Sequence, residues 1–216
     1  DRPPNIPYFD DKTIHFGFIL GYNSLYSNMV SNQNFPHNDT IMGFNADRSK
    51  GFQIGVISDL RLLSFVHLRL TPTISFADRL FTYDVADRNN INKIHQTKKD
   101  LEVIYLEAPL ELKVQSKRWR DFRPYLIGGM KYVYDLGSIK RKKLNEDEFL
   151  MKIDNQELMY TLGVGFDFYL EYFKFGVELK SSFGLNDILD HNFNNAYTDC
   201  IDKIKSQIFY INLTFE

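Results

Sequence analysis

The chain has 216 residues, and 15% of them are aromatic, with 19 Phe and 13 Tyr against a single Trp. This composition favours strands over helices, because flat rings suit a pleated surface. The 26 basic and 28 acidic residues leave a net charge of -2, which excludes a strong electrostatic field for polyanions, and we expect no nucleic-acid partner.

Four segments in the first half of the chain alternate apolar and polar residues, which predicts strands. Their apolar faces are Ile14, Phe16, Phe18, Leu20 and Tyr22; Phe52, Ile54 and Val56; Val66, Leu68, Leu70, Ile74 and Phe76; and Ile104, Leu106, Ala108, Leu110 and Leu112. Between these strands we expect a long polar loop at 23–50, a short connection at 59–64 and a second long, charged loop at 84–100.

The second half of the chain repeats the pattern with four more strands. Their apolar faces are Leu126, Met130, Tyr132 and Tyr134; Tyr160, Leu162, Val164, Phe166 and Phe168; Phe175, Val177, Leu179 and Phe183; and Phe209, Ile211, Leu213 and Phe215. A basic turn at 116–121 and a tight turn at 171–173 are short, whereas the stretches at 138–157 and 185–205 predict long loops.

Short and long connections therefore alternate along the chain. An outer-membrane barrel has this asymmetry, with short periplasmic turns and long extracellular loops. The sequence predicts an all-β fold, an eight-stranded antiparallel transmembrane β-barrel in the cell outer membrane, with both termini in the periplasm. We expect a single domain over 1–216, comprising a periplasmic N-terminal segment at 1–12 and the barrel at 13–216. No stretch approaches the about 18 apolar residues of a membrane-spanning helix, and a secretory signal is expected to have been removed before Asp1.

Alternation alone does not say which face points inward, because a water-soluble calyx such as a lipocalin shows the same pattern inverted. The interior of eight strands is only wide enough to be filled by side chains. The apolar face is too bulky for that space, while the polar face carries glycines at 17, 21, 55, 129, 163, 165, 176 and 184. We therefore expect the apolar face to contact outer-membrane lipid.

The charges of the polar face are balanced in sign, which predicts ion pairs in a nearly dry lumen. The residues that we expect to form this lumen charge network are Arg69, Glu107, Glu111, Arg123, Lys131, Asp167 and Glu178. His67, Lys174, Lys180, Asp59 and Asp135 lie on the same face.

Motifs for catalysis, cofactors and metals are not found, so we expect no enzyme, no cofactor, no metal site and no small-molecule substrate. Cys200 is the only cysteine, and the histidines at 15, 37, 67, 95 and 191 lack metal-ligand spacing. Most of these histidines are expected in solvated loops. Glu107 and Glu111 face the same way, as an acid-base pair would, but lumen salt bridges explain them without a nucleophile.

The first long loop is more apolar than a solvated loop should be. Its apolar residues include Tyr26, Met29, Phe35, Met42 and Phe44, which we take as a candidate partner-binding loop. Two interpretations stay open: the loop folds over the barrel mouth, or it forms a docking surface for another protein.

Several segments resemble a known family. The segments 51–56 and 68–76, Tyr105-Leu106-Glu107-Ala108-Pro109-Leu110, 123–129 and 163–167 are similar to the PorT family of Bacteroidetes outer-membrane barrels. The resemblance covers most strands. It implies an accessory role in type IX protein secretion, in which the barrel binds or supports a larger translocon.

The resemblance also implies that Glu107, Pro109, Arg123 and Tyr125 determine the lumen or the fold. A proline in a ladder predicts a bulge or bend at Pro109. Glu216 departs from the aromatic residue that usually ends bacterial barrels. The alternative function is a free-standing structural or adhesive barrel whose extracellular loops bind surface partners.

Overall fold

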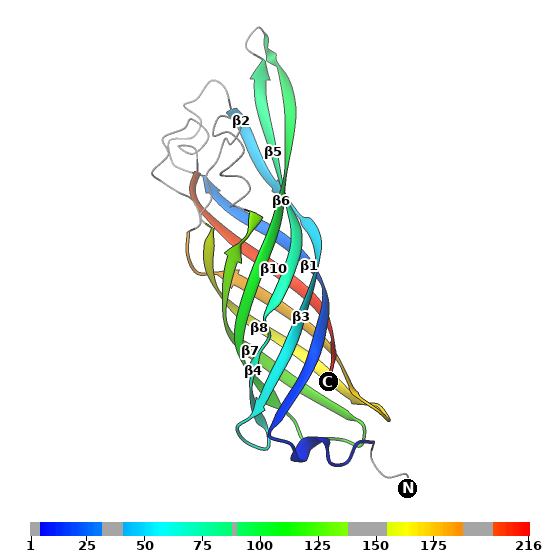
Figure 1. Ribbon diagram of the computed structural model, residues 1–216. Coiled ribbons are helices and arrows are strands. Elements are labelled where there is room, and N and C mark those ends of the chain that lie inside the picture. The colour runs from blue at the N-terminus through cyan, green and yellow to red at the C-terminus, as the bar shows by residue number, and fades with distance from the viewer. Residues whose placement is uncertain (1–4, 32–40, 88–89, 138–154, 188–200) are drawn as a thin grey trace.

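The computed structural model describes residues 5–31, 41–87, 90–137, 155–187 and 201–216, with backbone alone at 27, 29–31, 41–47, 78–87, 90–102 and 201–202. It is built almost entirely of strands (Figure 1). A short 3-10 helix, η1 (Phe9–Asp11), precedes β1 (Ile14–Ser31), β2 (Ile41–Asp47), β3 (Ser49–Arg61), β4 (Val66–Leu70), β5 (Thr73–Asp87), β6 (Asn90–Gln115), β7 (Phe122–Asp135), β8 (Gln156–Tyr169), β9 (Lys174–Gly184) and β10 (Ile201–Phe215).

These strands form a closed antiparallel barrel. Strand β1 pairs with β3 on one side and with β10 on the other, which closes the sheet. Strands β2 and β3 occupy one position around the barrel, because both pair with β5. Strands β4 and β5 occupy the next position, because both pair with β6. The ten strands therefore make eight positions around the barrel, as the sequence predicts. Among the described strands, closure leaves the barrel wall without an unpaired edge towards lipid.

Three strands continue well beyond the barrel wall. The hairpin of β5 and β6 is paired as far as Asp87 and Asn90, and β2 lies beside β5. Figure 1 shows this three-stranded extension above the wall. The predicted loops at 23–50 and 84–100 are thus wrong over most of their length, and β10 begins at Ile201, inside the predicted loop at 185–205. Antiparallel pairing satisfies the backbone hydrogen bonds of two strands even where neither strand has an apolar face. The strands therefore continue through polar sequence, where we predicted loops.

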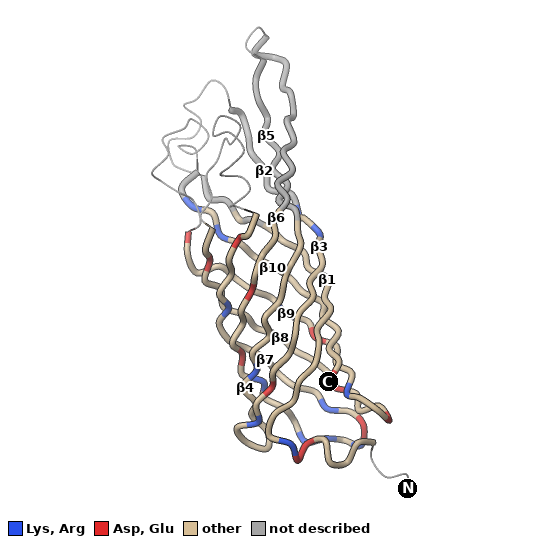
Figure 2. The backbone as a smooth tube through the Cα atoms, in the orientation of Figure 1, with Lys and Arg blue, Asp and Glu red and all other residues tan. Residues whose placement is uncertain are grey.

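The two faces of the barrel wall have opposite polarity. Phe18 is 63% exposed and Phe166 is 40% exposed on the outside, whereas the polar side chains at alternate positions are buried inside. Charged residues lie along the wall in Figure 2, and those in the middle of the strands, such as Lys131 and Glu178, are buried inside. The inverted arrangement of a lipocalin is therefore excluded.

The prediction of a bulge at Pro109 is wrong. Strand β6 pairs with β7 without a shift at this residue. On its other side, Leu70 pairs with Leu110 and Thr73 with Glu107, so no residue is inserted, although the strand assignment is interrupted at Thr71 and Pro72. Proline lacks an N–H group, and the ladder loses hydrogen bonds there while the register continues.

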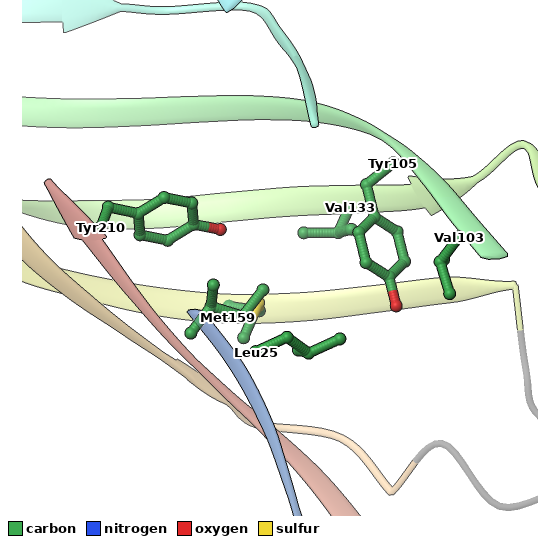
Figure 3. Packing of buried hydrophobic residues seen from close by; sticks show 7 residues of the cluster. Leu25, Val103, Tyr105, Val133, Met159 and Tyr210 are labelled. Atoms are coloured by element: carbon green, nitrogen blue, oxygen red, sulfur yellow. The ribbon is translucent and has the colours of Figure 1, made fainter. Parts of the chain in front are cut away.

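The interior changes character along the barrel axis. We name the two ends by their connections: the turn end carries the turns at 62–65, 116–121 and 170–173, and the loop end lies opposite. Figure 3 shows the apolar cluster in the loop-end half, formed by Leu25, Val103, Tyr105, Val133, Met159, Ile208 and Tyr210. Charged side chains fill the turn-end half. Among the described residues no helix is long and apolar enough to cross a membrane.

Candidate functional site

The centre of the turn-end half is Arg69, whose side chain is 0% exposed. Its guanidinium group donates to three carboxylates from different parts of the wall. The distances are 3.1 Å to Asp59 on β3, 2.5 Å to Glu178 on β9 and 2.8 Å to Glu216 just after β10. Such a cross-link spans the bore, and each buried charge in it depends on the others for compensation.

A second ion pair lies beside Arg69. The Lys113 ammonium donates to Asp167 at 2.6 Å and also lies 3.8 Å from the centre of the Tyr125 ring. The Tyr125 hydroxyl donates to Glu178 at 2.7 Å. A Cβ atom at Gly165 would lie 2.3 Å from this ring, so glycine is required there for the ring to fit.

Towards the middle of the barrel the ion pairs continue. Lys180 donates to Glu111 at 3.2 Å and lies 3.3 Å from Glu178, which joins the two layers. Lys131 donates to Glu107 at 3.0 Å and to the Tyr210 hydroxyl at 2.5 Å.

The Tyr210 hydroxyl itself donates to Glu107 at 3.0 Å. These bonds occupy Glu107 and Glu111 with separate lysines, an arrangement that compensates the charges of both carboxylates.

A small polar cavity of about 20 Å³ lies among these middle groups. It is lined by Ile19, Gln53, Thr71, Thr73, Glu107, Pro109, Glu111, Lys131, Thr161, Lys180, Ser182 and Tyr210. The volume suits about one water molecule, and the lining supplies enough polar atoms to hold it. In the described part of the chain, no three His, Cys, Asp or Glu side chains come together as a metal site.

All seven residues of the expected lumen charge network are buried inside the barrel. Six of them, Arg69, Glu107, Glu111, Lys131, Asp167 and Glu178, form the ion pairs above. Arg123 lies apart, at the turn-end mouth, where it donates to Gln115 at 2.7 Å and to Asp10 at 2.9 Å.

Sequence reasoning missed Glu216 as a member of this network. Its carboxylate contacts Arg69 and lies 2.7 Å from the Lys174 ammonium. Burial raises the pKa of the Glu216 carboxyl, but Lys174 and Arg69 outweigh burial and lower the pKa to about 2. The signal was present, because Glu216 continues the inward period of Tyr210, Asn212 and Thr214.

Two of the five histidines lie on the inward faces of strands, and both are buried. His67 is buried and lies 2.5 Å from Asp59, and His15 is buried beneath the ring of Phe9. Both occupy inward positions of their strands, and burial follows from closure of the barrel. His37 and His191 lie outside the described residues, as does the side chain of His95.

The candidate partner-binding loop is largely strand. Tyr26 and Met29 belong to β1, which pairs with β10 up to Ser31, and Met42 and Phe44 belong to β2. The half-buried Tyr26 ring lies 5.9 Å from the Arg48 guanidinium carbon. Phe35 lies outside the described residues, as do the side chains of Met29, Met42 and Phe44, so the choice between a cap and a docking surface stays a hypothesis.

Comparison with known proteins agrees with this geometry. The sequence pattern of the family described as "Outer membrane protein beta-barrel domain" matches residues 2–190. The chain belongs to this family. The family assignment and the apolar outer face together place this outer membrane protein in an outer membrane.

Solved barrels are similar to this outer membrane protein only at a distance. The outer membrane protein OprG from Pseudomonas aeruginosa is 14% identical, with a TM-score of 0.48 and 93% of each chain covered. Neisserial surface protein A is 8% identical, with a TM-score of 0.40 and 91% of this chain and 95% of that chain covered.

The outer membrane protease OmpT from Escherichia coli is 10% identical, with a TM-score of 0.33 and 94% of this chain and 93% of that chain covered. No curated protein sequence matches the chain. The family match and the closed barrel therefore carry the assignment.

Proposed function

We propose that this protein is a non-enzymatic outer-membrane barrel that works by contact with other proteins, as an accessory component that supports a larger translocon of type IX secretion. The observation that carries the contact role is the filled interior. Arg69 joins opposite walls of the bore, and the ion pairs above it leave room for about one water. A polypeptide in transit therefore needs a different conduit.

Two features support the secretion partner. The first is the resemblance of the segments at 51–56, 68–76 and 123–129 to the PorT family. The second is the extension of β2, β5 and β6, which continues beyond the barrel wall (Figure 1) and gives a partner a site to bind outside the wall.

The same extension favours a second candidate function. A free-standing structural or adhesive barrel would use its extracellular surface to bind partners without a translocon. The two functions differ in what the barrel contacts within the outer membrane.

Deletion of the gene, with measurement of exported surface proteins, tests the secretion role. Loss of export in the deletion strain, restored by the full chain, is the expected result, and normal export would reject the role. Purification in mild detergent separates the two candidates, because a co-purifying large outer-membrane protein supports the first and a lone monomer supports the second.

A shortened variant tests whether the extension of β5 and β6 binds the partner protein. Shortening the hairpin to the Leu80 and Asp100 pair removes the extension of β5 and β6, whereas a control replaces only its tip, beyond the Asp87 and Asn90 pair. We expect the first variant alone to lose the partner. Bilayer conductance should be negligible for the full chain, and a stable open channel would contradict the filled interior.

A further inference from the structure

An N-terminal segment, residues 5–12, lies across the mouth of the barrel at the turn end (Figure 1). It contains η1 and belongs to no strand. The wall closes without it, because β1 pairs with β3 from Ile14 and Leu60 onward. The segment is therefore an occupant of the mouth rather than a part of the wall.

The mouth binds the acidic side chain of this segment specifically. The Asp10 carboxylate accepts hydrogen bonds from Arg123 at 2.9 and 3.1 Å and from the Tyr169 hydroxyl at 3.1 Å. Arg118 lies 3.7 Å away. Without Asp10, Arg123 would keep Gln115 as its partner among these groups and leave a buried cation without a counter-charge.

The aromatic side chain before Asp10 has its own place. The Phe9 ring stacks on His15 at 4.3 Å between centroids and meets the edge of Tyr169 at 6.0 Å. The Lys174 ammonium lies 4.7 Å from the centre of the Phe9 ring. An aromatic ring and a carboxylate on adjacent residues are thus recognised together.

The mouth also binds the main chain of the segment. Arg118 donates to the carbonyl oxygens of Asn5 and Ile6, and Arg61 donates to those of Asp10 and Asp11. Asn5 donates from its backbone N–H to Asp121 at 2.8 Å. Guanidinium groups on successive carbonyl oxygens fit a peptide, whereas a lipid headgroup or a free anion lacks this repeat.

The backbone of the segment bends to reach these groups. Ile6 has φ of 45°, in the left-handed region that a β-branched residue rarely adopts. Contacts at the mouth, and not local preference, hold this conformation. The backbone strain at Ile6 is therefore relieved when the segment leaves the mouth.

From these contacts we infer that the turn-end mouth is a binding site for a short peptide with an aromatic residue followed by Asp, and that residues 5–12 fill it in cis. A segment of another protein with the same chemistry takes the site when the chain's own segment leaves. With the turn end in the periplasm, as the loop asymmetry predicts, that protein is periplasmic. The inference goes beyond the proposed function and does not depend on it.

A labelled synthetic peptide of residues 3–13 tests the site by fluorescence anisotropy. The protein is the full chain with Phe9→Ala and Asp10→Ala, which frees the mouth, and its folding is verified by its heat-dependent mobility on a gel. In the wild-type chain the segment at residues 5–12 competes with the added peptide, and loss of the charge-assisted bond of Asp10 weakens this competitor by about tenfold. We therefore expect the variant to bind the peptide at least about tenfold more tightly than the wild-type chain does.

Two matched peptides check the specificity. A peptide with Asp10→Asn should bind at least about tenfold more weakly, whereas Asp11→Asn should leave affinity unchanged, because only the main-chain carbonyl of the exposed Asp11 contacts the mouth. Absence of binding to the folded variant, equal binding of the Asp10→Asn peptide, or equal binding by the wild-type chain would overturn the inference.

Hydrogen exchange on the wild-type chain tests the inference without any variant. The backbone N–H groups of Phe9 and Lys12 are bonded only within the segment. They should exchange faster than the strand ladders and faster still with excess wild-type peptide, but not with excess Asp10→Asn peptide. Exchange that the wild-type peptide does not change would also overturn the inference.

Discussion

The two faces of the barrel wall are built from alternate residues of the same strands, yet they follow opposite rules. The inner face carries charges that are buried and mutually bonded, as at Arg69, while the outer face carries large apolar side chains that are exposed, as at Leu162. A water-soluble protein has the reverse arrangement. The inner face therefore tolerates charge only in pairs, whereas the outer face tolerates no charge near its middle.

Substitution of the central cation should have the largest effect. Arg69→Met removes the group that compensates Asp59, Glu178 and Glu216, and breaking a buried pair costs about 3 to 5 kcal/mol. We expect at least that loss in the free energy of unfolding, measured in denaturant by the loss of β-sheet circular dichroism. Lys117→Met at an exposed turn is the control, and a small effect at Arg69 would mean that the lumen is hydrated.

The converse substitution tests the outer face. Leu162→Arg places a cation at the middle of β8, where the leucine is 58% exposed, and should cost about 2 to 4 kcal/mol in a lipid bilayer. Leu62→Arg at the turn end should cost about 0 to 1 kcal/mol, because the cost of charge falls towards the interface. Equal costs at the two depths, measured by unfolding from vesicles, would contradict the placement of the lipid.

Two adjacent glycines of β7 lie on opposite faces of the wall, so alanine substitutions at them test the two faces at one point of the strand. A Cβ atom at the inward Gly129 would lie 2.1 Å from the carbonyl oxygen of Leu110, whereas one at the outward Gly128 would lie 3.1 Å from the flexible Leu162 side chain. Gly129→Ala should therefore cost about 1 to 3 kcal/mol of unfolding free energy. Gly128→Ala should change the unfolding free energy by no more than about 0.5 kcal/mol. A larger cost at Gly128 than at Gly129 would contradict the assignment of Gly129 to the inner face.

The smallest effect is expected at Glu216. Glu216→Gln leaves one oxygen that can accept from either Lys174 or Arg69, and it removes the negative charge of Glu216. This should cost about 1 kcal/mol at neutral pH, because Asp59, Glu178 and Asp167 still compensate the two cations. The folded pKa, about 2, lies below the ordinary value of 4.5, so the contribution is present above pH 4.5 and disappears as the pH falls towards 2. Unfolding curves of the two proteins should therefore converge on acidification, and a constant difference would contradict an ionised Glu216.

Much of the fold could be predicted from alternation alone. The period of two assigned Phe18 and Phe166 to the outside, and the seven charged residues of the expected network to the inside, because a strand directs successive side chains to opposite faces. The extents of β1, β5, β6 and β10 could not be predicted, since polar residues beyond the lipid look the same in a paired strand and in a loop.

The sequence by itself therefore determined the eight strand positions around the barrel, the closure of the sheet and the polarity of its faces, because these depend on local periodicity and on lipid. Only the tertiary structure decided which charges meet. Arg69 and Glu178 are 109 residues apart, and Asp10 and Arg123 are 113 apart. Contacts across a bore depend on the stagger and tilt of the whole barrel, which no segment encodes alone.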